Sequence, residues 1–237
     1  MRKILITLII GILIIPAFAL TAFAGTYTVL HDFLGQPDGG KSSYGSLGLV
    51  GDKFFGVTVN GGANNQGVLF TIEKDGSDFT ILHNFQYAVD GNASSPYASP
   101  ILSGDTFYGM ASAGGTAGDN VGAVYSIGTG GNNFTLMHIF DELDGTKPYG
   151  FLTLSGSTLY GTTRNNASAG PGLFEICTDG TGFTVLRHFT YDSADAYPSS
   201  GGSLVIAGTD LYGFSSSGGG ELDGSVYKIG VDGNGFS

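Results

Sequence analysis

The chain has 237 residues, of which 42 are glycine, 17 phenylalanine and 12 tyrosine, while only 12% are charged and the formal net charge is −11. Glycine at about 18%, against a usual share of roughly 7%, excludes a helical bundle, because each glycine costs a helix about 1 kcal/mol relative to alanine. The aromatic content excludes a disordered acidic chain and the lack of a three-residue glycine period excludes collagen, so the composition predicts an all-β protein with many tight turns.

Residues 1–24 have the features of a secretory signal peptide. Arg2 and Lys3 form a basic start, an apolar run follows over about 4–20, and Ala22-Phe23-Ala24 fits an A-x-A cleavage site. We expect cleavage there and export, with no membrane attachment afterwards, because no second hydrophobic segment follows. A retained membrane anchor is the alternative, which the small-residue cleavage site disfavours.

Loss of residues 1–24 leaves seven basic and 20 acidic residues, a net charge of −13. So acidic a chain is repelled by phosphate backbones, which excludes nucleic acid as a partner and leaves neutral polymers or cations. The single cysteine, Cys177, cannot form an internal disulfide and has no Cys–His motif around it, so we interpret it as a packed side chain and not as a nucleophile.

Three landmarks recur four times in one order along the rest of the chain, which predicts a single domain, residues 25–237, of four repeats. The first is a T-x-x-[HR]-x-F segment, the second an aromatic-Gly step, and the third a segment such as GVLFTI. The first landmark occurs at 28–33, 80–85, 135–140 and 184–189. The second occurs at 54–56, 107–109, 159–161 and 211–213. The third occurs at 67–72, 122–127, 171–176 and 224–229. The glycines of the second landmark are 52 or 53 residues apart, so each repeat has about 52 residues.

Each repeat is expected to contain four short antiparallel strands, rich in β-branched and aromatic residues. In the second repeat we place them at 79–85, 98–103, 106–112 and 122–127. Gly104-Asp105 predicts a tight turn between the second and third of these strands, and Asp75-Gly76 marks another such turn. Four antiparallel strands per repeat, arrayed radially, predict a β-propeller of four four-stranded blades, with the aromatic-Gly steps packed between blades.

The two ends of the chain suggest how the ring of blades closes. Residues 26–33 have the sequence of a strand that ends a blade, and the chain stops at 232–237, where the next copy of that strand would begin. The N-terminal strand would then complete the last blade, and the closed ring would leave no open edge and form a monomer. The alternative is a fragment of a longer array, cut near a repeat boundary.

These landmarks resemble the GloVer tandem repeat, which occurs in exported "choice-of-anchor" proteins of bacteria. The resemblance covers residues 26–237 and rests on LYGTT at 159–163, the Gly-rich stretch after it, GLFEI at 172–176, an Asp-Gly turn, the TVL-[HR]-x-F segments and a D-G…P loop. It implies an extracellular or surface-attached repeat protein, and it supplies no catalytic residues. Members often end in an anchoring segment, which this sequence lacks; that favours a truncated chain.

Both long loops of each blade should lie on one face, because both short turns lie on the other, and function on rigid β-scaffolds concentrates on such loops. The candidate ligand-binding residues are one aspartate per repeat on this face: Asp38, Asp90, Asp144 and Asp195. A ring of carboxylates could bind Ca²⁺ or sugar hydroxyls, but the D-x-[DN]-x-[DN]-G spacing of a calcium loop is missing. We favour the interpretation that each aspartate builds its own turn, and we predict no metal site and no cofactor.

Histidine recurs at one register, at His31, His83 and His138, and Arg187 takes this place in the fourth repeat. Three histidines make a zinc site only where they converge. These lie on the outer strands of different blades and should be spread around the rim, so we interpret them as a repeated structural hydrogen bond.

The chain has no nucleophile elbow, phosphate loop or metalloprotease motif, and we assign no catalytic residue. Four loop carboxylates could supply the pair, about 5–10 Å apart, that a polysaccharide hydrolase or lyase needs. They are Asp119, Glu142, Glu221 and Asp223. We predict instead a secreted, non-enzymatic module that binds carbohydrate or a cell-surface protein; a purely structural part of a longer extracellular array is the third alternative.

Overall fold

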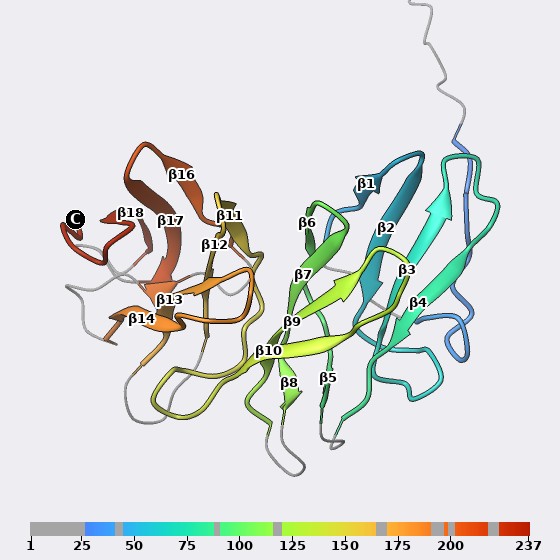
Figure 1. Ribbon diagram of the computed structural model, residues 1–237, viewed down its shortest axis with the longest axis horizontal. Helices are drawn as coiled ribbons and strands as arrows, with labels where there is room; N and C mark the ends of the chain where they lie inside the picture. Colours follow the sequence, from blue (N-terminus) through green and yellow to red (C-terminus); the bar gives the residue numbers. More distant parts are fainter. Residues whose placement is uncertain are drawn as a thin grey trace, which may run out of the picture.

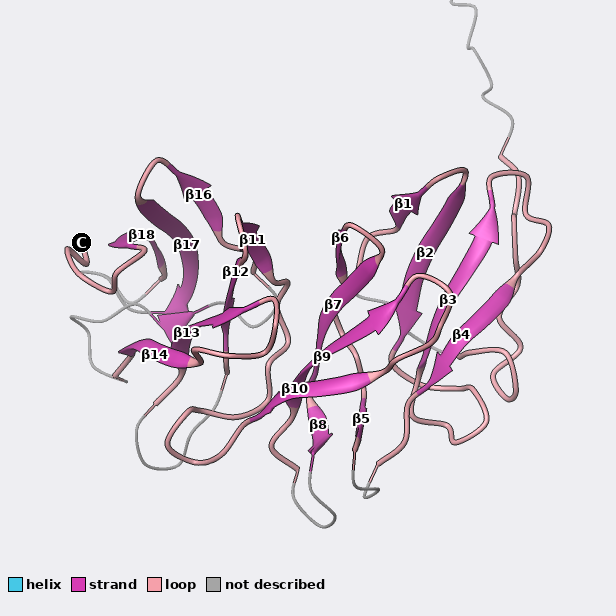
Figure 2. Ribbon diagram, viewed as in Figure 1, coloured by secondary structure: helices cyan, strands magenta, loops and turns pink. Residues whose placement is uncertain are grey.

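The computed structural model describes residues 27–40, 45–87, 91–115, 120–164, 170–190, 197–198, 202–217 and 223–237. Within these ranges the chain forms 18 β-strands and no helix (Figure 2). The expected all-β class is therefore confirmed. In the same ranges there is no helix long and apolar enough to cross a membrane.

Four antiparallel sheets, here called sheets 1 to 4, follow one another along the chain (Figure 1). Sheet 1 contains β1 (Gly48–Val50), β2 (Lys53–Thr58), β3 (Val68–Glu73) and β4 (Thr80–Asn84). Sheet 2 contains β6 (Ile101–Ser103), β7 (Thr106–Ala111), β9 (Ala123–Gly128) and β10 (Thr135–Ile139). Sheet 3 contains β11 (Thr153–Ser155), β12 (Thr158–Thr162), β13 (Gly172–Cys177) and β14 (Thr184–His188). Sheet 4 contains β16 (Val205–Ala207), β17 (Asp210–Ser217) and β18 (Ser225–Gly230), with β15 (Tyr197–Pro198) paired to the end of β17.

The aromatic-Gly step lies on β2, β7, β12 and β17, one in each sheet, and its glycine makes room for an aromatic ring. Gly161 of β12 pairs with Phe174 of β13, and a Cβ atom at Gly161 would lie 2.6 Å from Cζ of that ring. The same cross-strand relation joins Gly56 to Phe70, Gly109 to Tyr125 and Gly213 to Tyr227. Two landmarks of the sequence are thus the two halves of one packing unit.

The hydrophobic core lies between neighbouring sheets. Phe55 of sheet 1 packs on Phe107 of sheet 2, with ring centroids 4.5 Å apart. Tyr108 of sheet 2 lies in one cluster with Leu159 of sheet 3, and Tyr160 of sheet 3 lies in a cluster with residues of sheet 4. Each sheet therefore packs on the next in chain order, and the aromatic-Gly steps pack between sheets as expected.

The strands expected in the second repeat are confirmed to within three residues, as β4, β6, β7 and β9. A two-stranded ribbon of β5 (Asn92–Ser94) and β8 (Ala113–Gly115) was not expected. Its short Gly-, Ala- and Ser-rich strands carry no strand signal in the sequence, because they contain no β-branched or aromatic residue.

Closure of the ring by the N-terminal strand is not confirmed. Sheets 1 and 4 stand at opposite ends of the molecule (Figure 1). Residues 27–34 lie against sheet 1, where Gly76 in the β3–β4 turn closely approaches the backbone of Leu30. At the outer edge of β18, Lys228 exchanges two backbone hydrogen bonds with Ser237, of 2.9 and 3.0 Å. The four sheets are thus present, whereas the closed ring stays a prediction.

Candidate functional site

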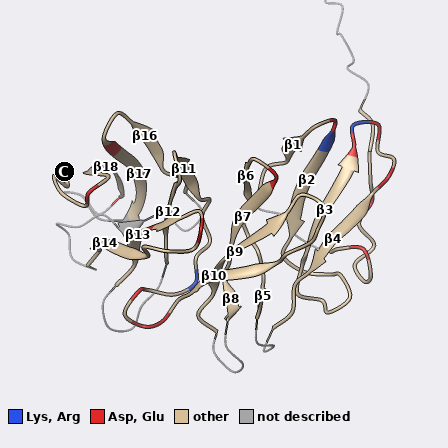
Figure 3. Cartoon of the chain, viewed as in Figure 1, with Lys and Arg blue, Asp and Glu red and all other residues tan. Residues whose placement is uncertain are grey.

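The long loops of the repeats gather at one end of the strands, which we call the loop face. The tight turns at residues 51–52 and 208–209, between β1 and β2 and between β16 and β17, lie at the opposite end (Figure 1). The β5–β8 ribbon projects among the loops (Figure 2). Asp and Glu residues are concentrated in turns and loops and are sparse along the strands (Figure 3). The segregation of long loops from tight turns agrees with the sequence expectation.

The described candidate aspartates contact the histidine of their own repeat. Asp38 lies 3.3 Å from Nε2 of His31 and accepts a hydrogen bond of 3.0 Å from the backbone N–H of Leu34. Asp144 lies 2.8 Å from Nε2 of His138. Asp38 thus bonds the backbone of its own loop, whereas the turn at Asp144 is held by Asp141, whose Oδ1 accepts hydrogen bonds from the backbone N–H groups of Leu143 and Asp144. Asp90 and Asp195 lie outside the described residues.

In the second repeat an amide takes the place of the carboxylate. Asn92 Oδ1 lies 3.2 Å from Nε2 of His83. Burial of the imidazole lowers the pKa of His83 below its usual value of 6.5, and the contact with Asn92 opposes this shift. The neutral form of His83 is therefore favoured in the folded protein.

Each histidine also lies flat on a phenylalanine about fifty residues further along the chain. His83 stacks on Phe134 at 3.9 Å between centroids, and His138 stacks on Phe183 at 3.5 Å. His31 stacks on Phe79 at 3.9 Å. In the fourth repeat the guanidinium of Arg187 lies 3.8 Å above Phe236, a cation–π contact that replaces the stacked imidazole.

These contacts spread the imidazoles over β4, β10 and the N-terminal segment, and each one fixes a loop to the next sheet. In the part of the chain that the structure describes, no three His, Cys, Asp or Glu side chains come together to hold a metal ion. Of the loop carboxylates considered for hydrolysis, Glu142 and Asp223 are described and exposed, while Asp119 and Glu221 fall in ranges that are not described.

A cavity opens where the first strands of three sheets begin. It has a volume of about 170 Å³ and is lined by residues 46–48, 99–101 and 151–152. The hydroxyl of Ser99 donates a hydrogen bond to the carbonyl of Ser46 and so ties two of its walls together. The cavity is smaller than the roughly 300–1,000 Å³ of sites that enclose a drug-sized ligand, so it accommodates a small group or one end of a larger ligand.

Two tyrosines and an arginine from three long loops gather near this cavity. Tyr97 and Tyr149 meet edge to face, with centroids 4.4 Å apart, and each lies two residues before a cavity-lining residue in the chain. The Arg164 guanidinium lies 5.3 Å from the centre of the Tyr149 ring. This group, the tyrosine cluster, was not singled out in the sequence, although Tyr44, Tyr97 and Tyr149 recur at one register before the first strand of a repeat.

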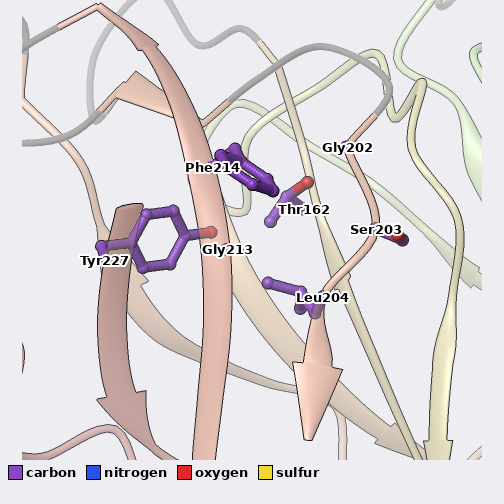
Figure 4. Close-up of a pocket in the computed structure, with 7 residues that line it drawn as sticks. All are labelled: Thr162, Gly202, Ser203, Leu204, Gly213, Phe214 and Tyr227. Atoms are coloured by element: carbon purple, nitrogen blue, oxygen red, sulfur yellow. The ribbon is translucent and has the colours of Figure 1, made fainter. Parts of the chain in front are cut away.

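A second gap, between sheets 3 and 4, has no room for a ligand. It is bounded by Thr162 and by residues 202–204, and the ring of Tyr227 lies over Gly213 beside it (Figure 4). No water-sized molecule fits inside it. Burial raises the pKa of the Tyr227 phenol, which stays protonated. The gap is therefore part of the packing between sheets.

A family model described as the Gloeobacter/Verrucomicrobia repeat matches residues 16–227. A comparison with curated proteins found no match.

Solved structures show more distant likenesses. The nidogen/laminin complex aligns with 77% of this chain and 73% of that chain at 14% identity and a TM-score of 0.43. TolB from Acinetobacter baumannii aligns with 77% of this chain and 39% of that chain, at 13% identity and a TM-score of 0.43. A gluconolactonase from Xanthomonas campestris aligns with 77% of this chain and 56% of that chain, at 19% identity and a TM-score of 0.48. The chain thus spans less than two thirds of the last two proteins.

Proposed function

The chain belongs to the Gloeobacter/Verrucomicrobia repeat family, and on this premise we propose that it is a secreted β-propeller-type module that binds carbohydrate at its loop face without chemical turnover. In this proposal residues 1–24 direct export, and sheets 1 to 4 are the blades of a ring. The loops of neighbouring blades then combine into one binding surface. Binding of a cell-surface protein is the alternative occupant of the same face.

The tyrosine cluster is the observation that carries the proposal. Its rings are only partly buried and Arg164 is exposed, so the loop face presents aromatic surface beside a hydrogen-bonding cation. The negative π-face of an aromatic ring attracts the weakly positive C–H face of a sugar, and the apolar body of tyrosine can be covered while its hydroxyl stays hydrated. The adjoining cavity would receive one substituent of the bound sugar.

Catalysis is not part of the proposal, because the two described candidate aspartates serve the loops. Asp38 and Asp144 are engaged by His31 and His138. Calcium is not required for the same reason, and we expect the protein to bind equally well in Ca²⁺ and in EDTA. Its strongly acidic character also favours neutral glycans over nucleic acids.

A glycan array probed with the purified protein tests this function. We expect reproducible binding to a subset of neutral glycans, with no release of shorter products. Tyr149→Ala should raise Kd by about tenfold, equivalent to roughly 1.4 kcal/mol, because it removes the centre of the cluster. Tyr212→Ala, a partly buried tyrosine near the β16–β17 turn, is the matched control and should keep the affinity. Turnover of a glycan would support a hydrolase or lyase, and an unchanged affinity in Tyr149→Ala would remove the cluster from the site.

A further inference from the structure

The cavity beside the tyrosine cluster is built from equivalent positions of the first three repeats. Most of its walls come from two registers, which lie five and four residues before the glycine of the tight turn that follows the first strand. The residues at these registers are Ser46, Ser99 and Phe151, and Leu47, Pro100 and Leu152. The strands that begin beside them, β1, β6 and β11, are each the edge strand of a sheet. The cavity therefore lies where the edges of three sheets come together.

Phe151 breaks the pattern of the first register. The first two repeats have serine there, and the fourth repeat has Ser203. The Ser99 hydroxyl donates a hydrogen bond to the carbonyl of Ser46, a contact that a phenylalanine side chain cannot make. Phe151 is partly buried, lines the cavity and belongs to none of the buried clusters that the described residues form. This ring therefore contributes to the wall of the cavity and not to the hydrophobic core.

The lining combines apolar walls with a few polar groups. Carbon-rich surface comes from Phe151 and Leu152 on one side and from Pro100 and Ile101 on another. Ser46 is exposed, so its hydroxyl can meet a ligand. In the described sheets the edge strands β1, β6 and β11 have a strand on one side only, so their other side offers backbone N–H and C=O groups. A group that suits this lining has an apolar end and a polar end that both donates and accepts hydrogen bonds.

The volume of the cavity favours a group of several heavy atoms. One water molecule needs about 10–15 Å³ of accessible space, and the cavity has about 170 Å³. A hydroxyl or a single methyl group would leave most of this space unfilled, and the walls would then lack partners for van der Waals contact. An acetamido group has four heavy atoms, a methyl group at one end, and an amide that donates through N–H and accepts through C=O. Its size and its chemistry both match the cavity.

We propose that the protein recognises sugars that carry an acetamido group, with the methyl end of this group in the cavity against Phe151. The inference rests on the proposed function, because it names the class of glycan that the loop face binds. The sugar ring lies on the tyrosine cluster, whose Tyr149 is two residues before Phe151 in the chain. The amide of the sugar meets the Ser46 hydroxyl and the backbone of the strand edges.

The charges of the protein favour neutral members of this class. The described residues that line the cavity carry no charge, so an ammonium group in place of the acetamido group would be buried there without a partner. The chain as a whole is strongly acidic, so a sugar that also carries a carboxylate is repelled. Neutral N-acetylhexosamines are therefore the sugars that fit.

Titration calorimetry with chitotetraose and cellotetraose tests the proposal, because the two tetramers differ in having an acetamido or a hydroxyl group at C2. We expect chitotetraose to bind about tenfold more tightly, as is usual for one extra small apolar group in a hydrophobic pocket. Glycans without acetamido groups that bind equally well or better would overturn the inference and leave the proposed function standing. Binding of no glycan at all would overturn the proposed function, and this inference with it.

Phe151→Ser tests the position of the acetamido group. It introduces the residue that the other three repeats have at this register, so we expect the variant to fold. Its affinity for chitotetraose should fall about tenfold and its affinity for cellotetraose should stay the same, whereas a damaged fold would lower both. An unchanged preference for chitotetraose in Phe151→Ser would overturn the assignment of the cavity.

Two further variants serve as controls. Tyr149→Ala should lower the affinity for both tetramers by a similar factor, because the tyrosine cluster contacts the sugar ring that they share. Leu143→Ser changes a leucine that is 70% exposed in a loop away from the cavity lining, and it should keep both affinities. Loss of the preference for chitotetraose in Tyr149→Ala but not in Phe151→Ser would place the acetamido group on the tyrosines and overturn the proposal.

Discussion

At the residue scale, the recurring histidine is explained by two contacts that act together. Its ring stacks on a phenylalanine of the next repeat, and its Nε2 meets a loop carboxylate or amide of its own repeat. In the fourth repeat Arg187 lies over Phe236 in the same way, so a cation–π contact takes the place of the stacked histidine. The structural role could be predicted from this exchange of residue type, because an arginine cannot replace a metal ligand. The stacking partner could not be predicted, since nothing local in the sequence links His83 to Phe134.

The lowered pKa of His83 makes stability depend on pH. The unfolded chain binds the proton near pH 6.5, whereas the folded protein binds it only at lower pH, so the stabilisation is complete above pH 6.5 and is lost as the pH falls below that value. We expect the Tm to decrease between pH 7.5 and pH 5.5, and to decrease less in His83→Gln, which has no titrating ring. Thermal unfolding followed by circular dichroism measures both.

Asn92→Ala provides the companion measurement. The Asn92 contact raises the pKa of His83 and so opposes the effect of burial. Its removal should make the decrease in Tm on acidification steeper than in the wild type, whatever it does to the Tm at pH 7.5. An identical pH dependence in wild type and His83→Gln would show that another group is responsible.

At the scale of strands and sheets, the sequence predicts where the strands lie, but it does not predict which residues pair across them. Their order and spacing predict four sheets and place most strands within three residues, because β-branched and aromatic runs alternate with Gly and Asp turns. Their pairing could not be predicted, because only the register of β12 on β13 sets Gly161 opposite Phe174. The tyrosine cluster was missed for a similar reason, since Tyr97 and Tyr149 are 52 residues apart and meet only where two repeats pack together.

Gly161→Ala should destabilise the protein by about 1–3 kcal/mol, which is the usual cost of overpacking a core. The new methyl group would lie 2.6 Å from Cζ of Phe174 and 3.0 Å from Cδ2 of Leu152. Because Phe174 is fully buried between sheets 2 and 3, the strain cannot be relieved toward solvent. The Tm should therefore fall by several degrees.

Gly130→Ala is the matched control for this substitution. Gly130 lies in the β9–β10 turn, its backbone does not need a positive φ, and the nearest atom to an added Cβ is 3.5 Å away. Its stability should stay within about 0.5 kcal/mol of the wild type, as is usual for surface positions. Equal effects of the two substitutions would mean that loss of glycine, and not the clash with Phe174, sets the stability.

At the scale of the whole molecule, sheets that contact only their neighbours leave two ends. In such an array stability is a sum of repeat terms and nearest-neighbour interface terms, and the terminal units carry an unmet apolar face unless something covers it. Sheets 2 and 3 are covered by a neighbouring sheet on both sides, whereas sheet 4 exposes Phe214 and Val226. The number of repeats and their small antiparallel sheets could be read from the sequence, but the open arrangement depends on how each sheet is inclined to the next, which no single residue determines.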